Sequence, residues 1–196
     1  YPGETEELYY DKAGNRNRRV INGEETIYEY DSCNRLMDIR NQNGELLTEY
    51  SYDRQGNLLR DNKAEYTFDD KNRVVKAESF DGNVQINRYN AEGLRDEMEE
   101  NGRLIRFVFD GGRVVTEETQ EDTIHYITAN RRLIASDSEK AKTYYHYASD
   151  ELGSITHVAD EEGNVLNRYE YDAFGNMAKC EENIHNRFRY CGEQYD

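Results

Sequence analysis

Aromatic and polar residues alternate along this chain with a period of two. In Thr26-Tyr28-Tyr30 and Asn167-Tyr169-Tyr171 the aromatic residues share alternate positions, and mostly polar residues stand between them. Because successive side chains of a β-strand point to opposite faces of its sheet, this pattern predicts strands with one aromatic face and one polar face. The same alternation recurs at Thr48-Tyr50-Tyr52, Tyr66-Phe68, Phe107-Phe109, Tyr145-Tyr147 and Phe188-Tyr190.

One aromatic residue ends each alternating stretch, and these residues recur at a nearly fixed spacing. They are Tyr10, Tyr30, Tyr52, Phe68, Tyr89, Phe109, Tyr126, Tyr147, Tyr171 and Tyr190. The successive gaps are 20, 22, 16, 21, 20, 17, 21, 24 and 19 residues. A sustained period of this length indicates a repeat protein. We therefore predict a single repeat array over residues 1–196, with about nine repeat intervals. We expect it to be an excised piece of a much larger protein, because it opens at Tyr1-Pro2 without Met.

Turn residues follow the aromatic positions. The next residue is Asp at Asp11, Asp31, Asp53, Asp69, Asp110 and Asp172. Three of these continue as Asp-x-x-Gly, ending at Gly14, Gly56 and Gly175. The Asp carboxylate can accept the N–H two residues on, and Gly can take the positive φ that leads into the next strand.

A second set of turns lies about halfway through the repeats. Its members are Asn22-Gly23, Asn43-Gly44, Asp81-Gly82, Asn101-Gly102 and Glu162-Gly163. Such dipeptides are typical of β-hairpins. The predicted fold is all-β, an antiparallel meander of hairpins that forms a curved, open strip.

Charge and composition narrow the range of partners. Lys and Arg number 25 and Asp and Glu 41, which gives a net charge of −16 and argues against a nucleic-acid partner. No apolar run is long enough to cross a bilayer, so we expect no direct membrane insertion. The chain has 17 Tyr and 6 Phe, and we expect a thin buried layer rich in tyrosine.

Candidate reactive groups are scattered. Three cysteines (Cys33, Cys180, Cys191) are too few for a disulfide framework or a zinc site, although Cys180 and Cys191 could face each other across a hairpin. Four histidines are dispersed, and the nearby Ser154 and His157 lack an orienting third group. The turn aspartates could bind calcium, but turn capping explains them better. We interpret the acidic pairs Glu117-Glu118, Glu161-Glu162 and Glu181-Glu182 as solvated faces. We therefore expect no catalytic residue, cofactor or metal.

The repeat resembles that of the YD-repeat, or Rhs-repeat, family over the whole chain. The resemblance rests on the recurring Tyr-Asp-x-x-Gly-Asn core. It is sharpened by "YHYASDELGSITHVADEEGNVLNRYEYDAFGN" (145–176), similar to the segment near the end of a bacterial Rhs core, with Glu151 in place of a usual His. The final "FRYCGEQYD" (188–196) is similar to the start of the family's closing motif.

The resemblance implies a function as well as a fold. Family members form a β-shell, which in bacteria encloses a variable C-terminal toxin and in animal teneurins stands at the cell surface. The family's self-cleaving aspartates lie beyond the closing motif and match no position here. We therefore expect a non-enzymatic fragment of a shell around the C-terminal toxin domain of a secreted, cell-surface or cell-wall-associated protein. The alternative is an adhesion module that binds carbohydrate or a protein receptor through exposed tyrosines.

Overall fold

The structure is a computed structural model that describes residues 5–172 and 174–195. Over this range the chain consists of β-strands and turns, with a short 3-10 turn, η1 (Tyr190–Gly192), as its one helical segment. The strands are β1 (Glu6–Tyr10), β2 (Arg16–Ile21), β3 (Glu24–Tyr30), β4 (Leu36–Asn41), β5 (Leu46–Glu49), β6 (Ser51–Tyr52), β7 (Leu58–Arg60), β8 (Ala64–Phe68), β9 (Val74–Ser79), β10 (Val84–Arg88), β11 (Glu97–Glu100), β12 (Arg103–Asp110), β13 (Arg113–Glu118), β14 (Thr123–Ala129), β15 (Arg132–Ser138), β16 (Thr143–Ser149), β17 (Ile155–Ala159), β18 (Val165–Tyr171) and β19 (Met177–Glu182). The prediction of an all-β fold is confirmed.

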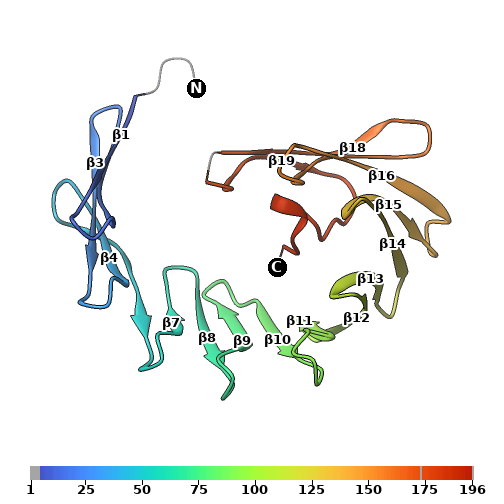
Figure 1. Cartoon of the computed structure of the whole chain (residues 1–196), viewed down its shortest axis with the longest axis horizontal. Coiled ribbons are helices and arrows are strands. Elements are labelled where there is room, and N and C mark those ends of the chain that lie inside the picture. The colour runs from blue at the N-terminus through green and yellow to red at the C-terminus, as the bar shows by residue number, and fades with distance from the viewer. Residues whose placement is uncertain (1–4, 173, 196) are drawn as a thin grey trace. The chain divides into compact units, whose positions relative to one another are not determined.

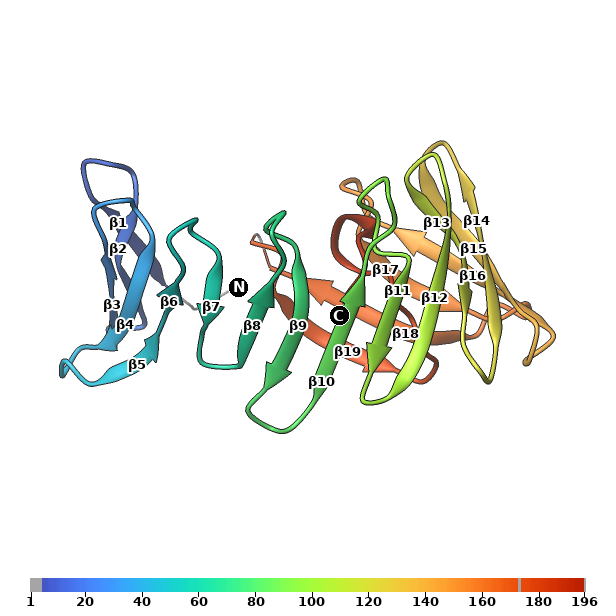
Figure 2. The same cartoon turned by 90° about the horizontal axis from the view of Figure 1, so that it is seen from below.

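The chain divides into two compact units. Unit 1 comprises Tyr1–Arg88 and Glu99–Gly102, and unit 2 comprises Tyr89–Met98 and Arg103–Asp196. In unit 1, β1 to β5 form one antiparallel sheet, and β6 to β10 form a further antiparallel run. In unit 2, β12 to β19 pair antiparallel, each with its successor in the chain. Figure 1 and Figure 2 show this order within each unit, which confirms the predicted meander.

The aromatic face of the strands supplies the core. In β18, Asn167 and Tyr169 are buried and Tyr171 is half-buried, while Arg168 and Glu170 between them are exposed. Fully burying a large apolar side chain contributes about 1.5–3 kcal/mol, so a few such positions account for much of a small unit's stability. Unit 2 holds two buried clusters, formed by Met98, Ile105, Phe107, Val114 and Tyr126 and by Ile155, Val158 and Tyr169.

The Asp-x-x-Gly turns share one hydrogen-bond pattern, which Asp53 illustrates. Its Oδ1 atom accepts the backbone N–H groups of Gln55 (2.9 Å) and Asn57 (2.8 Å). The Asn57 side-chain amide then donates to Asp53 Oδ2 at 2.7 Å. The Asn that follows each Gly therefore completes the turn by satisfying the second carboxylate oxygen, which explains the recurrence of Gly-Asn. The same bonds join Asp11 to Asn15 and Asp172 to Asn176.

Only part of the second turn set has the predicted form. Asn22-Gly23 and Asn101-Gly102 both have positive φ at the two central residues, as a two-residue hairpin turn requires. The turns at Gly44, Gly82 and Gly163 instead repeat the Asp-x-x-Gly arrangement. The residue three positions before each Gly, which is Asn41, Ser79 or Asp160, accepts the Gly N–H through its carbonyl oxygen. The prediction of a distinct turn class was therefore wrong for these three. Asn41 and Ser79 cap their turns through their side chains as Asp does, and Asp160 opens an Asp-x-x-Gly stretch of its own.

Tyrosine hydroxyl groups join neighbouring repeats. Tyr30 donates to the carbonyl oxygen of Arg16, Tyr52 to that of Leu36 and Tyr171 to that of Ile155, each at 2.9 Å. Each acceptor is the first residue of a strand in the preceding repeat, β2, β4 or β17. Each of these tyrosines also follows a shift in strand register. These contacts give a physical reason for tyrosine instead of phenylalanine at the three positions.

Candidate functional site

The aromatic, Asp and Gly residues that define the repeat are its signature residues. They lie at successive strand ends and turns and do not gather at one point. Asp11, Asp31, Asp53, Asp69 and Asp172 each accept backbone N–H groups of their own turn. Where Arg replaces Asn, the guanidinium takes over the side-chain contact. The side-chain and backbone hydrogen bonds from Arg73, together with its charge, hold the pKa of Asp69 at about 2. These carboxylates are therefore engaged with their own turns.

Asp110 departs from this pattern. It is the last residue of β12 and pairs with Arg113, so that only Gly111 and Gly112 form the turn. The aromatic position before it, Phe109, is half-buried beside a buried cluster. Near the N-terminus, the signature residue Tyr10 is 57% exposed. Phe68, like Phe109, lacks a hydroxyl that could join repeats.

Gly14 and Gly175 form a natural test pair for the turns. Both have positive φ, +89° and +83°, which strains any residue with a Cβ atom. At Gly14 a Cβ would meet nothing within 4 Å, whereas at Gly175 it would lie 2.6 Å from Cε1 of Tyr190. We expect Gly14→Ala to cost about 1 kcal/mol and Gly175→Ala about 2–4 kcal/mol of unfolding free energy, measured by urea denaturation. Equal losses for the two variants would contradict the clash with Tyr190.

The most distinctive part of unit 2 is its C-terminal segment, residues 183–195. After β19 the chain turns back, and Figure 1 shows this segment lying inside the curve of strands β12 to β19. Phe188 and Tyr190 were predicted to continue the strand pattern, and this was wrong. Phe188 makes one isolated bridge to Gln194, and Tyr190 opens η1. Cys191 has a φ of +53°, which a β-strand does not allow.

A buried ion pair fastens this segment to β13. Arg187 Nε and Nη2 donate to Oε2 and Oε1 of Glu117, each at 3.0 Å, in a two-point contact. The side chains are 2% and 1% exposed. The Tyr126 hydroxyl donates to Glu117 Oε2 at 2.8 Å, and His185 Nε2 lies 3.5 Å from Oε1. Three residues, one from β14 and two from the C-terminal segment, thus surround one carboxylate.

The electrostatics of Glu117 follow from these contacts. Burial raises the pKa of its carboxyl, but the hydrogen bonds from His185 and Arg187 and the charge of Arg187 outweigh burial and lower the pKa to about 2. The same burial, with the charge of Glu117, raises the pKa of Tyr126 well above its ordinary value. Glu117 was interpreted from the sequence as part of a solvated face, and this was wrong, whereas its neighbour Glu118 is exposed.

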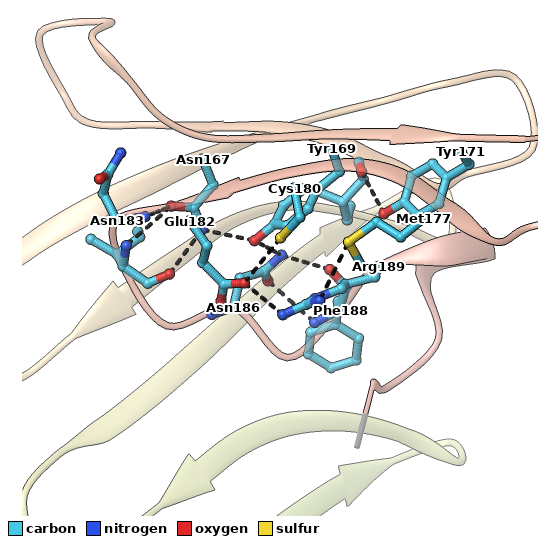
Figure 3. Close-up of polar contacts among 12 residues, drawn as sticks. Asn167, Tyr169, Tyr171, Met177, Cys180, Glu182, Asn183, Asn186, Phe188 and Arg189 are labelled. Atoms are coloured by element: carbon cyan, nitrogen blue, oxygen red, sulfur yellow. Dashed lines mark hydrogen bonds and ion pairs between the residues drawn. The ribbon is translucent and has the colours of Figure 1, made fainter. Parts of the chain in front are cut away.

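Asn167 in β18 forms a second attachment point for the C-terminal segment. Its Nδ2 donates to the carbonyl oxygen of Ile184 (2.9 Å) and to the Tyr169 hydroxyl (2.9 Å). Its Oδ1 accepts the backbone N–H groups of Asn183 (2.9 Å) and Ile184 (3.1 Å). Figure 3 shows the amide reaching from β18 to this segment. Asn167 is fully buried, and four contacts satisfy its polar atoms.

The other end of the segment is tied down by Arg189 and its neighbours. The Arg189 Nη2 atom lies 2.5 Å from Glu182 Oε2, and Figure 3 shows this ion pair. The guanidinium of Arg189 also faces the rings of Tyr169 and Tyr195. The carbonyl oxygen of Arg189 accepts the N–H of Ile155 at 2.9 Å. The whole arrangement is a docking site for a peptide segment, built from ion pairs and amide contacts.

The remaining candidate groups form no reaction centre with one another. Ser154 is fully buried, and its Oγ accepts the N–H of Cys191, while His157 faces Thr156 instead of Ser154. Cys33, Cys180 and Cys191 are exposed and free, so the possible Cys180–Cys191 pair is not formed. Within residues 5–172 and 174–195, no three His, Cys, Asp or Glu residues gather as metal ligands. No helix in that part of the chain has the length and apolar character needed to cross a membrane.

Comparison with known sequences finds a matching family model and relatives that are much longer than this chain. It matches the family model described as teneurin YD-shell over residues 2–196. The tRNA3(Ser)-specific nuclease WapA of Bacillus spizizenii is 33% identical over 203 residues, covering 97% of this chain and 8% of that protein. The double-stranded DNA deaminase toxin A of Burkholderia cenocepacia is 27% identical, covering 86% of this chain and 11% of that protein. The chain therefore spans a small part of the length of these relatives.

Solved structures show the same fold at low sequence identity. The TcdB2-TccC3-Cdc42 structure aligns with a TM-score of 0.52 and 13% identity, covering 99% of this chain and 15% of that one. The Photorhabdus luminescens Tc holotoxin pore aligns with a TM-score of 0.50 and 11% identity, covering 98% and 16%. The match over nearly all residues agrees with the repeat pattern, and the chain belongs to the teneurin YD-shell family.

Proposed function

We propose that this chain is a non-catalytic section of a shell wall, part of a secreted or cell-surface bacterial toxin whose C-terminal effector domain the shell encloses. The observation that carries the proposal is where the polar groups of the repeat are used. The Asp carboxylates cap their own turns, and the hydroxyls of Tyr30, Tyr52 and Tyr171 bind main-chain carbonyls of adjacent repeats. Polar groups that bind the chain's own backbone in this way hold the repeats together as a wall.

The activities named for the relatives support a structural role. One is named a tRNA nuclease and another a double-stranded DNA deaminase, yet both match this chain over most of its length. The matched region is 8% of the first protein and 11% of the second. A region shared by enzymes of two different chemistries is expected to serve what they have in common, and the variable effector is expected to lie elsewhere.

The alternative role, adhesion through exposed tyrosines, gains no support from the repeat itself. Tyr28, Tyr126 and Tyr169 are buried, and the three hydroxyl groups that join repeats are already bound. Some tyrosines are exposed, among them Tyr9, Tyr10, Tyr144 and Tyr195. Tyr9 and Tyr10 are neighbours in β1, Tyr144 lies in β16 and Tyr195 lies in the C-terminal segment. Scattered exposed aromatics of this kind are ordinary on a protein surface.

The proposal is tested by growth of bacteria that express the effector with and without its wall. We would express the segment encoded after this region of the parent gene alone, fused to the complete repeat array, and fused to an unrelated β-protein of similar size. We expect growth arrest from the segment alone and from the unrelated fusion, and relief from the array. Arrest that the array does not relieve, or normal growth in every strain, would contradict encapsulation.

A further inference from the structure

Unit 2 contains a cavity that the shell role does not explain. Its volume is about 750 Å³, within the range of ligand pockets. It lies between the tips of the β12–β13 and β14–β15 hairpins, the turn after β16, and the C-terminal segment. All of these elements belong to unit 2.

The charge of this cavity is opposite to that of the chain. Four arginines line it, Arg95, Arg113, Arg131 and Arg132, against one carboxylate, that of Glu193. The lining thus carries a formal charge of 4 − 1 = +3 in a chain whose net charge is −16. Concave walls of one charge sign concentrate ligands of the other sign.

Two of the four arginines are held in place by hydrogen bonds, and the other two are exposed without a carboxylate partner in the part of the chain that the structure describes. Arg132 donates to the carbonyl oxygens of Asp150 (2.9 Å) and Glu151 (2.8 Å), and Arg95 donates to Gln194 Oε1 at 2.6 Å. Arg113 and Arg131 are exposed, and among the described residues no carboxylate lies within ion-pair distance of either. Exposed guanidinium groups with no carboxylate within ion-pair distance are suited to two-point binding of a ligand's carboxylates.

The cavity also has an apolar wall. Val114 and Tyr126 are buried core residues, and Phe109, Leu133 and Phe188 pack against them. The rings of Tyr126 and Phe188 meet edge to face with centroids 4.8 Å apart. A ligand that fits both features carries acidic groups next to an aromatic or aliphatic group.

We propose that this cavity binds an acidic peptide segment, whose carboxylates pair with Arg113 and Arg131 and whose apolar side chain rests on Leu133 and Phe188. Charge complementarity favours this occupant over a nucleic acid. The carboxylates of a short peptide can pair with the arginines of the cavity, whereas a long polyanion would extend beyond it onto a chain whose net charge is −16. The inference is independent of whether the shell encloses a toxin.

Binding can be measured by fluorescence anisotropy with this chain and a labelled short peptide in which Glu alternates with Leu and Phe. A peptide with Lys in place of Glu is the matched probe, and ATP is a competitor that supplies phosphate instead of carboxylate. We expect the Glu peptide to bind, the Lys peptide to bind at least ten times more weakly, and ATP to compete poorly. No binding of the Glu peptide, or its displacement by ATP at lower concentrations than by unlabelled peptide, would overturn the proposal.

Matched variants separate the cavity from general charge effects. The double variant R113Q/R131Q is expected to weaken binding of the Glu peptide about tenfold or more. The control R54Q/R168Q makes the same charge change at exposed arginines outside the cavity, and we expect an effect below about twofold in 0.15 M salt. Both pairs replace exposed residues, and circular dichroism verifies that each variant is folded. Equal weakening by the two double variants would overturn the proposal.

Discussion

Arg187→Met is expected to lower the free energy of unfolding of unit 2 by about 3–5 kcal/mol. The substitution keeps an apolar side chain of similar length but leaves Glu117, whose side chain is 1% exposed, without its two-point partner. Removing one partner of a buried ion pair costs more free energy than the pair contributes to stability, because the desolvation of the remaining carboxylate is no longer offset. Urea denaturation measures the loss, and hydrogen exchange at β13 and residues 186–188 locates it.

A second ion pair in unit 2 provides the matched control. Arg106 Nε and Glu97 Oε1 are also 3.0 Å apart, but these side chains are 58% and 29% exposed. We expect Arg106→Met to cost less than about 1 kcal/mol, since water screens an exposed pair. Because the two N–O distances agree, the contrast reports burial together with the two-point geometry of the Arg187–Glu117 pair. Similar losses for Arg187→Met and Arg106→Met would contradict the role assigned to the buried pair.

The carboxyl group of Glu117 also makes the stability of unit 2 depend on pH. The pKa of Glu117 is lowered to about 2, against about 4.3 for an unfolded glutamate. A lowered folded-state pKa contributes stability above the unfolded value, and this contribution is lost as the pH falls through the folded value. The stability difference between the native chain and Glu117→Gln should therefore be full at pH 6 and shrink between about pH 4.3 and 2. A difference that stays constant over this window would contradict the assignment.

Strand bulges set the limit on what the sequence could predict for this site. Glu117 was interpreted from the sequence as part of a solvated face because it forms an acidic pair with Glu118. Strict alternation would also place Glu117 on the opposite face of β13 from Val114 and Thr116. The register between β12 and β13 shifts between Val108 and Phe109, so that Val108 pairs with Thr116 while Phe109 pairs with Val114. Glu117 therefore stands opposite the buried Phe107. The shift falls just before the repeat aromatic Phe109, as it does at Tyr30, Tyr52 and Tyr171. One extra residue in a strand moves every later side chain to the other face, which the alternation pattern alone does not predict.

The fold was far more predictable than the docking of its last residues. Strand alternation and the Asp-x-x-Gly turns depend on residues within a few positions of one another, as with Asp53 and Asn57. The pair Arg187–Glu117 joins residues 70 positions apart, so its partner could not be deduced from spacing. Asn167 did carry a signal, because it is a polar residue on the aromatic face of β18. A buried amide needs partners, and the C-terminal segment supplies them.

Asn167→Ala is expected to release the beginning of the C-terminal segment, at a cost of about 3 kcal/mol. The change leaves the backbone N–H groups of Asn183 and Ile184, and the carbonyl oxygen of Ile184, without the partner that now satisfies them. Exposing these groups to water is the least costly response, so the segment should open locally before the strands unfold. Hydrogen exchange should therefore accelerate at Asn183 and Ile184 while β12 to β16 stay protected.

The control for this prediction is Asn164→Ala, in the turn immediately before the same strand. Asn164 is exposed, and its side-chain amide donates to Asp160 Oδ2 at 2.9 Å within one turn. Because water can replace that bond, we expect a loss below about 1 kcal/mol and no change in exchange at Asn183. If Asn167→Ala left Asn183 and Ile184 as protected as they are in the native chain, the ion pair at Arg187 would be sufficient to hold the segment. Faster exchange at Asn183 and Ile184 in Asn167→Ala, with no change in Asn164→Ala, would show that the ion pair at Arg187 does not by itself keep the chain folded back on the sheet.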